Sequence, residues 1–115
     1  KLQTALTDVS QAIQLKPTFV YAYANRGQIR MALGDLQGAI TDCTRAIQLN
    51  PALAELYWNR GQLYVRVRDR QAALVDFQKA AQLFANQGKR DRYQQVLTVM
   101  QQLQRESPDQ QSRKY

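Results

Sequence analysis

The sequence predicts an all-α protein in which antiparallel helix pairs stack on one another as a solenoid. The interval from Pro17 to Pro51 is also the interval at which the run Asn-Arg-Gly-Gln, at residues 25–28, returns at residues 59–62. A period of about 34 residues is typical of two-helix repeat units, each of which needs a neighbour to bury its apolar face. We therefore expect a scaffold for binding, and we expect no strand.

The same spacing relates many further positions. The pairs are Tyr23 with Tyr57, Ala39 with Ala73, Asp42 with Asp76, and Ala46 with Ala80. The match also runs backwards, because Ala5, Asp8, Ala12 and Ile13 reproduce the second half of the next unit. Residues 1–16 are therefore expected to be the second helix of a truncated repeat whose first helix is missing.

Each expected helix has its own sequence signals. The helices are predicted over residues 1–15, 19–33, 36–49, 53–67, 70–86 and 90–105. Gly34 followed by Asp35 predicts a tight turn, and Asn50 before Pro51 predicts the end of a helix, because proline disfavours a helical residue before it. The last helix places apolar residues on one face at helical spacing and glutamines on the others, which is typical of a terminal cap. Its apolar residues are Tyr93, Val96, Leu97, Met100 and Leu103.

These helices predict one domain over residues 1–105. Within it, residues 17–50 and 51–85 form two repeats after the truncated one, and residues 88–105 form a capping helix. Residues 106–115 have little to bury and are expected to be a flexible tail.

The repeated residues resemble those of the tetratricopeptide repeat family. Units of this family carry an aromatic and then a small residue in the first helix, two alanines in the second, and a closing proline. Those places are held by Tyr23, Gly27, Ala39, Ala46 and Pro51, and again by Tyr57, Gly61, Tyr64, Ala73 and Ala80. The resemblance covers about residues 1–85 and implies a right-handed superhelix whose concave groove is lined mainly by the first helices.

The sequence departs from the family pattern at four positions. Arg30 and Cys43 stand where an aromatic residue is usual, Arg68 where glycine is usual, and Ala85 where the next proline is expected. These departures concern local packing and do not change the predicted fold.

The composition argues against an enzyme. The chain has no histidine, one cysteine and no glycine-rich phosphate loop or nucleophile elbow, so the commonest catalytic and metal-binding groups are absent. We expect no cofactor and no metal, and we expect Cys43 to be a small buried residue. The repeated Asp42 and Arg26 suggest a structural ion pair within a unit, with Arg26 to Asp8 between units as the alternative.

The groove of such a stack is expected to hold a peptide or protein segment. The predicted contacts are Tyr21, Asn25, Gln28, Trp58, Asn59, Gln62 and Arg66. Asn25 and Asn59 can each donate and accept hydrogen bonds, which suits an extended backbone. Trp58 either points into the groove as an anchor or packs on a neighbouring helix, and both interpretations stay open.

The family uses similar asparagines in carboxylate clamps for chaperone tails. Such a clamp also needs basic residues, and the matching face of the last helix offers Gln94, Gln95 and Thr98, so a clamp is not favoured. The first helix carries a stripe that an upstream helix or a second copy would cover, which suggests a homodimer. This stripe is formed by Leu2, Leu6, Val9 and Ile13.

The charge of the chain suggests what kind of partner it binds, and the absence of targeting signals suggests where it is located. The net charge of +7 and the pI of about 9.9 suggest an acidic partner. A basic scaffold for nucleic acid is the alternative, although the basic residues are not expected to form one strip. A regulatory or oligomerisation module of a larger protein is a further alternative. No apolar run is long enough to span a membrane and no secretory signal is visible, so a cytoplasmic location is expected.

Overall fold

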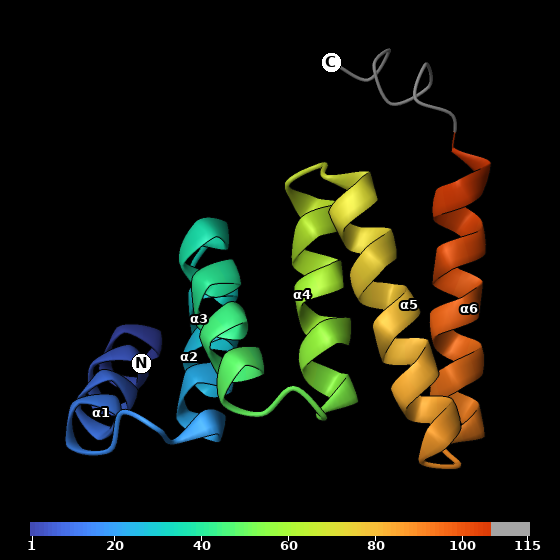
Figure 1. Cartoon of the computed structure of the whole chain (residues 1–115). Coiled ribbons are helices and arrows are strands. Elements are labelled where there is room, and N and C mark those ends of the chain that lie inside the picture. The colour runs from blue at the N-terminus through green and yellow to red at the C-terminus, as the bar shows by residue number, and fades with distance from the viewer. Residues whose placement is uncertain (107–115) are drawn as a thin grey trace.

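The computed structural model describes residues 1–106 and, within them, contains six α-helices and no strand. The helices are α1 Leu2–Leu15, α2 Val20–Ala32, α3 Leu36–Leu49, α4 Ala54–Arg66, α5 Arg70–Asn86 and α6 Arg90–Arg105 (Figure 1). The all-α prediction is confirmed. The predicted tail, apart from Glu106, lies outside the described residues.

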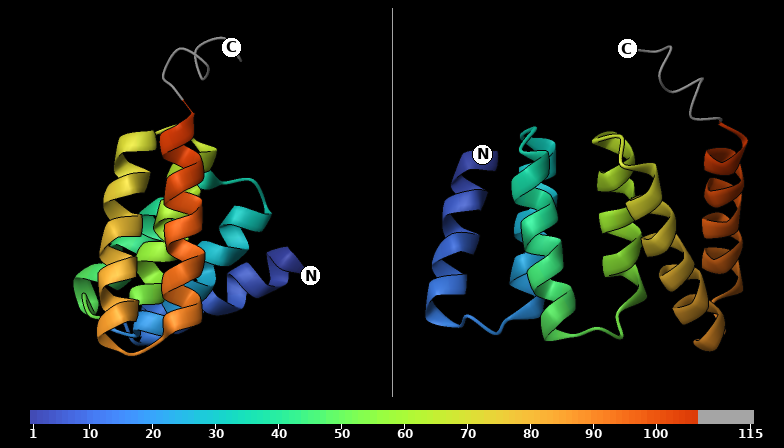
Figure 2. Two further views of the ribbon diagram at one scale, coloured as in Figure 1. Left: turned by 90° about the vertical axis from the view of Figure 1, so that its right-hand side faces the viewer. Right: turned by 45° about the horizontal axis from the view of Figure 1, so that its top comes forward.

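The helices form a single row in chain order. Each helix packs mainly against its neighbours along the chain, so that α2 contacts α3, α3 contacts α4, and α4 contacts α5. Figures 1 and 2 show this row running from α1 at one end to α6 at the other. A stack held by contacts between neighbours is what defines a solenoid.

Equivalent caps and turns start the second helix of each repeat. The Asp35 carboxylate accepts a hydrogen bond from the Gly38 N–H at 2.9 Å, and the Asp69 carboxylate accepts one from the Ala72 N–H at 3.1 Å. Each aspartate thereby satisfies a backbone N–H that has no partner inside the helix. The residue before each aspartate has a positive φ, 88° at Gly34 and 67° at Arg68.

The paired glycines allow the helices of each repeat to approach closely. A Cβ atom on Gly27 would lie 3.3 Å from the carbonyl oxygen of Ala39, and one on Gly61 would lie 2.6 Å from the ring of Phe77. The alanines of the repeat pattern are also completely buried, and they are Ala39, Ala46, Ala73 and Ala80. The close approach expected of these positions is therefore present in both repeats.

A partly buried ion pair repeats with the fold. Arg26 donates two hydrogen bonds to the Asp42 carboxylate at 2.9 and 2.7 Å, and Arg60 donates two to the Asp76 carboxylate, both at 2.8 Å. The pair within a unit is the one that forms, and Asp8, the alternative partner for Arg26, is exposed.

Each repeat adds one further bond to its ion pair. Arg30 donates to Asp42 at 2.9 Å, and Arg60 donates to the Thr44 hydroxyl of the preceding repeat at 3.1 Å. Hydrogen bonding to the aspartates is the main cause that raises the pKa of Arg26 and of Arg60 above the usual value. The second of these networks ties neighbouring repeats together.

The last helix covers the end of the stack. Val96 and Leu103 are buried, and Tyr93, Leu97 and Met100 pack against the same core. Arg70 of α5 donates a hydrogen bond to the Leu103 carbonyl oxygen at 2.8 Å, which fixes the far end of α6. The apolar face predicted for this helix is thus the face that contacts α5.

The expectation of an exposed stripe on α1 is wrong for Ile13 and holds only in part for Leu6 and Val9. Ile13 is buried, and Val9 packs against the main core, because α1 rests on α2 along this side. Leu6 is half-buried, and only Leu2 is exposed, at 45%. Ile13 therefore stabilises the stack and is not available to a second copy, whereas Val9 is buried only in part.

No helix of the described residues is long and apolar enough to cross a membrane.

Candidate functional site

A first hollow lies between α2, the start of α4 and the loop before α6. Its volume is about 410 Å³. Polar side chains around it come from three elements, and they are Tyr21, Asn25, Gln28, Glu55, Asn59, Gln87 and Lys89. Glu55 and Lys89 are the charged side chains in this lining, and the Glu55 carboxylate is paired with Arg92 at 2.7 Å.

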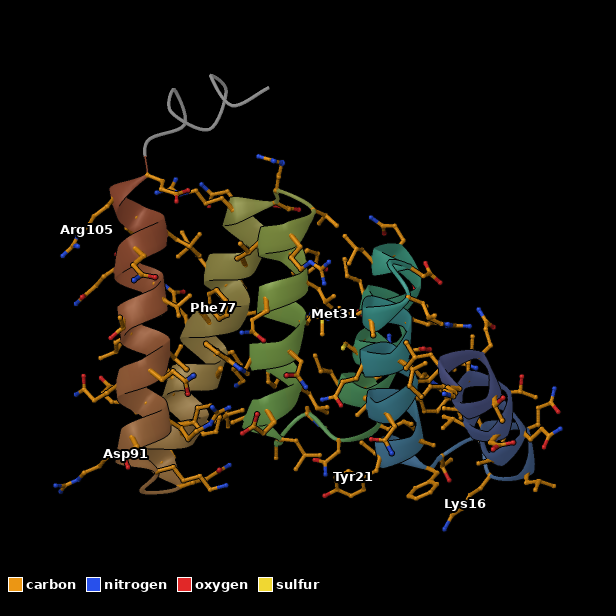
Figure 3. The ribbon with its side chains drawn as sticks, turned by 180° about the vertical axis from the view of Figure 1, so that it is seen from behind. Lys16, Tyr21, Met31, Phe77, Asp91 and Arg105 are labelled. Carbon is orange, nitrogen blue, oxygen red and sulfur yellow. The ribbon has the colours of Figure 1, made fainter. Side chains whose placement is uncertain are left out.

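A second hollow continues from the first along α2 and α4. Its volume is about 290 Å³, and it is lined by Gly27, Gln28, Met31, Cys43, Asn59, Gln62 and Leu63. Gln28 and Asn59 line both hollows, so the two form one continuous depression, which we call the α2–α4 groove. Figure 3 shows Met31 between α2 and α4 and Tyr21 at the beginning of α2.

Four amide side chains line the α2–α4 groove in two matched pairs. Asn25 and Asn59 are equivalent positions of the two repeats, and so are Gln28 and Gln62. Among the described residues, none of these four amides has a hydrogen-bond partner. Each amide carries two N–H donors and one carbonyl acceptor, so the groove presents repeated hydrogen-bonding groups that the chain itself does not use.

Five of the seven predicted contact residues line this groove. They are Tyr21, Asn25, Gln28, Asn59 and Gln62. Arg66 is exposed at the end of α4 and lies outside the lining of both hollows. The structure therefore brings together the residues from the beginning and middle of α2 and α4, and it leaves Arg66 apart.

The prediction of Trp58 as a groove contact is wrong, because its side chain packs on neighbouring helices. Its side chain is only 6% exposed, and its ring centroid lies 5.3 Å from that of Phe77 on α5. The guanidinium of Arg92 on α6 lies 5.5 Å from the Trp58 ring and 4.9 Å from the Phe84 ring. The side of α4 next to Tyr57 thus faces α5 and α6, so Trp58 is a core residue and not an exposed anchor.

The corner between α5 and α6 contributes side chains to the site that the sequence pattern does not predict. Lys89 and Gln87 line the first hollow from this corner, and Arg92 binds the Glu55 carboxylate at 2.7 Å. These residues lie beyond the last complete repeat, so the repeat spacing gave no signal for them. Arg92 is nevertheless positioned firmly, since its cation also stacks on two aromatic rings.

Cys43 is a buried thiol, as expected. It is 3% exposed, and burial raises its pKa to about 11, with the nearby Asp42 carboxylate acting in the same direction. The thiol is therefore protonated near neutral pH and is a poor nucleophile there. Within the described residues, no three His, Cys, Asp or Glu side chains gather closely enough to hold a metal ion.

These features define a helical-repeat protein with an open groove along the first helices of its repeats. A model described as "TPR repeat" matches residues 27–67, and one described as "Tetratricopeptide repeat" matches residues 54–87. The two matches together run over residues 27–87. The chain belongs to the tetratricopeptide repeat family. A comparison with curated proteins found no match.

Several solved structures have the same fold. The yeast Sti1 TPR2B domain in complex with pHsp70 aligns with a TM-score of 0.84 and 19% identity, covering 92% of this chain and 85% of the other. The chaperone SycD of Yersinia enterocolitica, in complex with a peptide of the translocator YopD, aligns at 0.85 and 14%, covering 90% and 80%. The first TPR of Spaghetti (RPAP3), bound to the HSP90 peptide SRMEEVD, aligns at 0.81 and 18%, covering 91% and 79%. At these identities the likeness concerns the fold.

Proposed function

We propose that this chain is a noncatalytic interaction module that holds an extended segment of a peptide or protein in the α2–α4 groove. The observation that carries the proposal is the set of four groove-lining amides without partners among the described residues. An extended segment exposes backbone N–H and C=O groups along its length, and amide side chains pair with both kinds of group. The matched spacing of the amides on α2 and α4 suits a ligand that runs past both repeats.

The solved structures of the same fold support a peptide as the ligand. The Sti1 domain is in complex with pHsp70, the RPAP3 domain is bound to an HSP90 peptide, and SycD is in complex with a translocator peptide. The fold therefore accommodates peptides in other proteins. The acidic HSP90 peptide is not taken as the model for this ligand, because a clamp for its carboxylates needs further basic residues and the matching face of α6 offers Gln94, Gln95 and Thr98.

The proposal is tested by removing the two asparagines together. Wild-type chain, the Asn25→Ala/Asn59→Ala variant and a control are immobilised and exposed to lysate of the source organism. The control is Gln37→Ala/Gln71→Ala, because these two glutamines are also exposed and equivalent in the two repeats but lie on α3 and α5, outside both hollows. Equal melting temperatures of the three proteins show that the substitutions leave the fold intact.

We expect a protein that the wild type and the control retain and the asparagine variant loses. Two hydrogen-bonding side chains at about 1 kcal/mol each correspond to roughly 30-fold weaker binding. Equal retention by all three proteins would contradict the proposal. Recovery of mainly nucleic acid, released steeply as salt rises, would favour the basic-scaffold alternative instead.

A further inference from the structure

The two repeats differ at one buried position beside the α2–α4 groove. Phe77 in the second repeat corresponds to Cys43 in the first. The Phe77 ring is completely buried and lies against Gly61, where an added Cβ would be only 2.6 Å from it. At the equivalent place in the first repeat, an added Cβ on Gly27 would lie 3.4 Å from the small Sγ atom of Cys43.

A hollow lies on the groove side of this smaller side chain. The second hollow, of about 290 Å³, has Gly27, Cys43 and Leu63 in its lining, together with Gln28 and Asn59 from the groove. Gly27 and Cys43 are the equivalents of the glycine and the ring that meet in the second repeat. The first repeat thus keeps the glycine, which there faces the Ala39 carbonyl oxygen and Cys43, and it has no aromatic ring at this position.

We propose that this hollow is a specificity pocket that takes the phenyl ring of a phenylalanine from the bound segment. The inference rests on the proposed function and adds the chemistry of the ligand. The protein itself indicates the occupant, because Phe77 fills the corresponding place one repeat later. Met31, which is half-buried, gives the ring an apolar contact, and Cys43 and Leu63, which are 3% and 1% exposed, form the floor of the hollow. Sulfur atoms and aromatic rings attract each other. Gln28 and Asn59 at the mouth pair with the backbone on either side of that residue.

The probe for this pocket is a display library of short random peptides, selected on immobilised chain. The wild type is compared with two variants that change only the pocket. Cys43→Phe fills the hollow from inside and copies the pairing of Phe77 with Gly61. Cys43→Ala removes the sulfur and leaves the hollow open, so it is the matched control. If Cys43→Phe fails to fold, Cys43→Leu fills most of the same space with a more adaptable side chain.

We expect the wild type and Cys43→Ala to select peptides with phenylalanine at one fixed position. The selected peptides should bind Cys43→Phe about tenfold more weakly or worse, because a buried aromatic anchor carries a large part of the binding energy. Replacing that phenylalanine by alanine in a selected peptide should weaken binding to the wild type and leave binding to Cys43→Phe nearly unchanged.

The other outcomes separate this inference from the proposed function. One such outcome is that the selected peptides depend on Asn25 and Asn59 and yet show no preference for an aromatic residue. Another is that they bind Cys43→Phe as tightly as the wild type. Either result would contradict the pocket and leave the groove supported as the binding site. A selection in which no peptide depends on Asn25 and Asn59 would overturn the proposed function and the pocket together.

Discussion

Asp42 shows at the scale of one residue how the repeat is held together. Its carboxylate is 1% exposed and accepts hydrogen bonds from Arg26 and Arg30. Asp42→Asn would place an amide N–H against the guanidinium groups and leave their charge uncompensated. We expect the free energy of unfolding to fall by about 2–3 kcal/mol, somewhat less than for a fully buried pair because both arginines are partly exposed. Urea denaturation measures this change.

Asp8 provides the matched control for that prediction. It stands one repeat before Asp42, at the equivalent position of α1, but its side chain is exposed. Asp8→Asn should change the unfolding free energy by less than about 0.5 kcal/mol. Similar losses in the two variants would mean that the Arg26 pair contributes nothing specific to stability.

The two repeat glycines should respond differently to the same substitution. Gly61→Ala places a methyl group 2.6 Å from the buried Phe77 ring, so the ring or the helix must shift. The cost of this overpacking should exceed the gain of about 1 kcal/mol in helix propensity and leave a net loss of about 1–2 kcal/mol.

Gly27→Ala is the comparison for that substitution. Its nearest contacts would be at 3.3–3.5 Å, so its melting temperature should stay much closer to that of the wild type. A larger loss for Gly27→Ala than for Gly61→Ala would contradict the difference between the two repeats on which the pocket depends.

At the scale of the elements, the turn between α4 and α5 is strained. Arg68 has φ 67°, whereas the corresponding turn between α2 and α3 uses Gly34 at φ 88°. A side chain in this left-handed region costs about 1–2 kcal/mol. Arg68→Gly should therefore stabilise the chain by about 1 kcal/mol, reduced by whatever its side-chain contacts contribute.

The matching substitution in the other turn should act in the opposite direction. Gly34→Ala introduces the same strain, and nothing lies within 4 Å of the added Cβ, so the loss reports the backbone alone. Thermal unfolding of both variants measures the two changes. A stabilised Gly34→Ala would show that the left-handed conformation is not kept in solution.

The helices of the two repeats were predictable because the residues that mark their ends occur in both repeats. Three of the six predicted helices, residues 36–49, 70–86 and 90–105, agree with the structure at both ends, and the other three differ by one residue at one or both ends. Aspartate caps after positive-φ residues and the proline after Asn50 mark these ends locally, so no tertiary information is needed. The partly buried pair of Arg26 with Asp42 was also predictable, since both residues recur at the repeat spacing.

The parts of the site that depend on how helices face one another were not predictable. The position of Trp58, one residue after Tyr57, is compatible with either the groove or the contact between helices, and the placement of α5 and α6 decides for the contact between helices. Cys43 was recognised as a departure from an aromatic pattern, but the resulting hollow depends on how α4 closes over it. Lys89 lies outside the repeats and has no periodic signal.

At the scale of the whole molecule, the stack places α2 and α4, the first helices of the two repeats, along one groove. The net charge of +7 is not gathered there, since among the described residues Lys89 is the one basic residue in the lining of the two hollows and Glu55, which pairs with Arg92, is the one acidic residue. Recognition in the α2–α4 groove should therefore depend on hydrogen bonds and on one apolar pocket more than on charge. Binding should accordingly weaken only modestly as salt rises, which a titration at increasing ionic strength measures.

The most direct measurement of the central claim is site-specific photo-crosslinking. A photoreactive residue is placed at Gln28, which lines both hollows, or at Gln71, an exposed glutamine on α5 that lines neither, and the crosslinked segment is sequenced by mass spectrometry. We predict that Gln28 crosslinks to one protein segment, and that Asn25→Ala/Asn59→Ala abolishes this crosslink while Gln71 gives none. Crosslinking from Gln71 alone, or with equal yield from both positions, would contradict the assignment of the α2–α4 groove as the binding site.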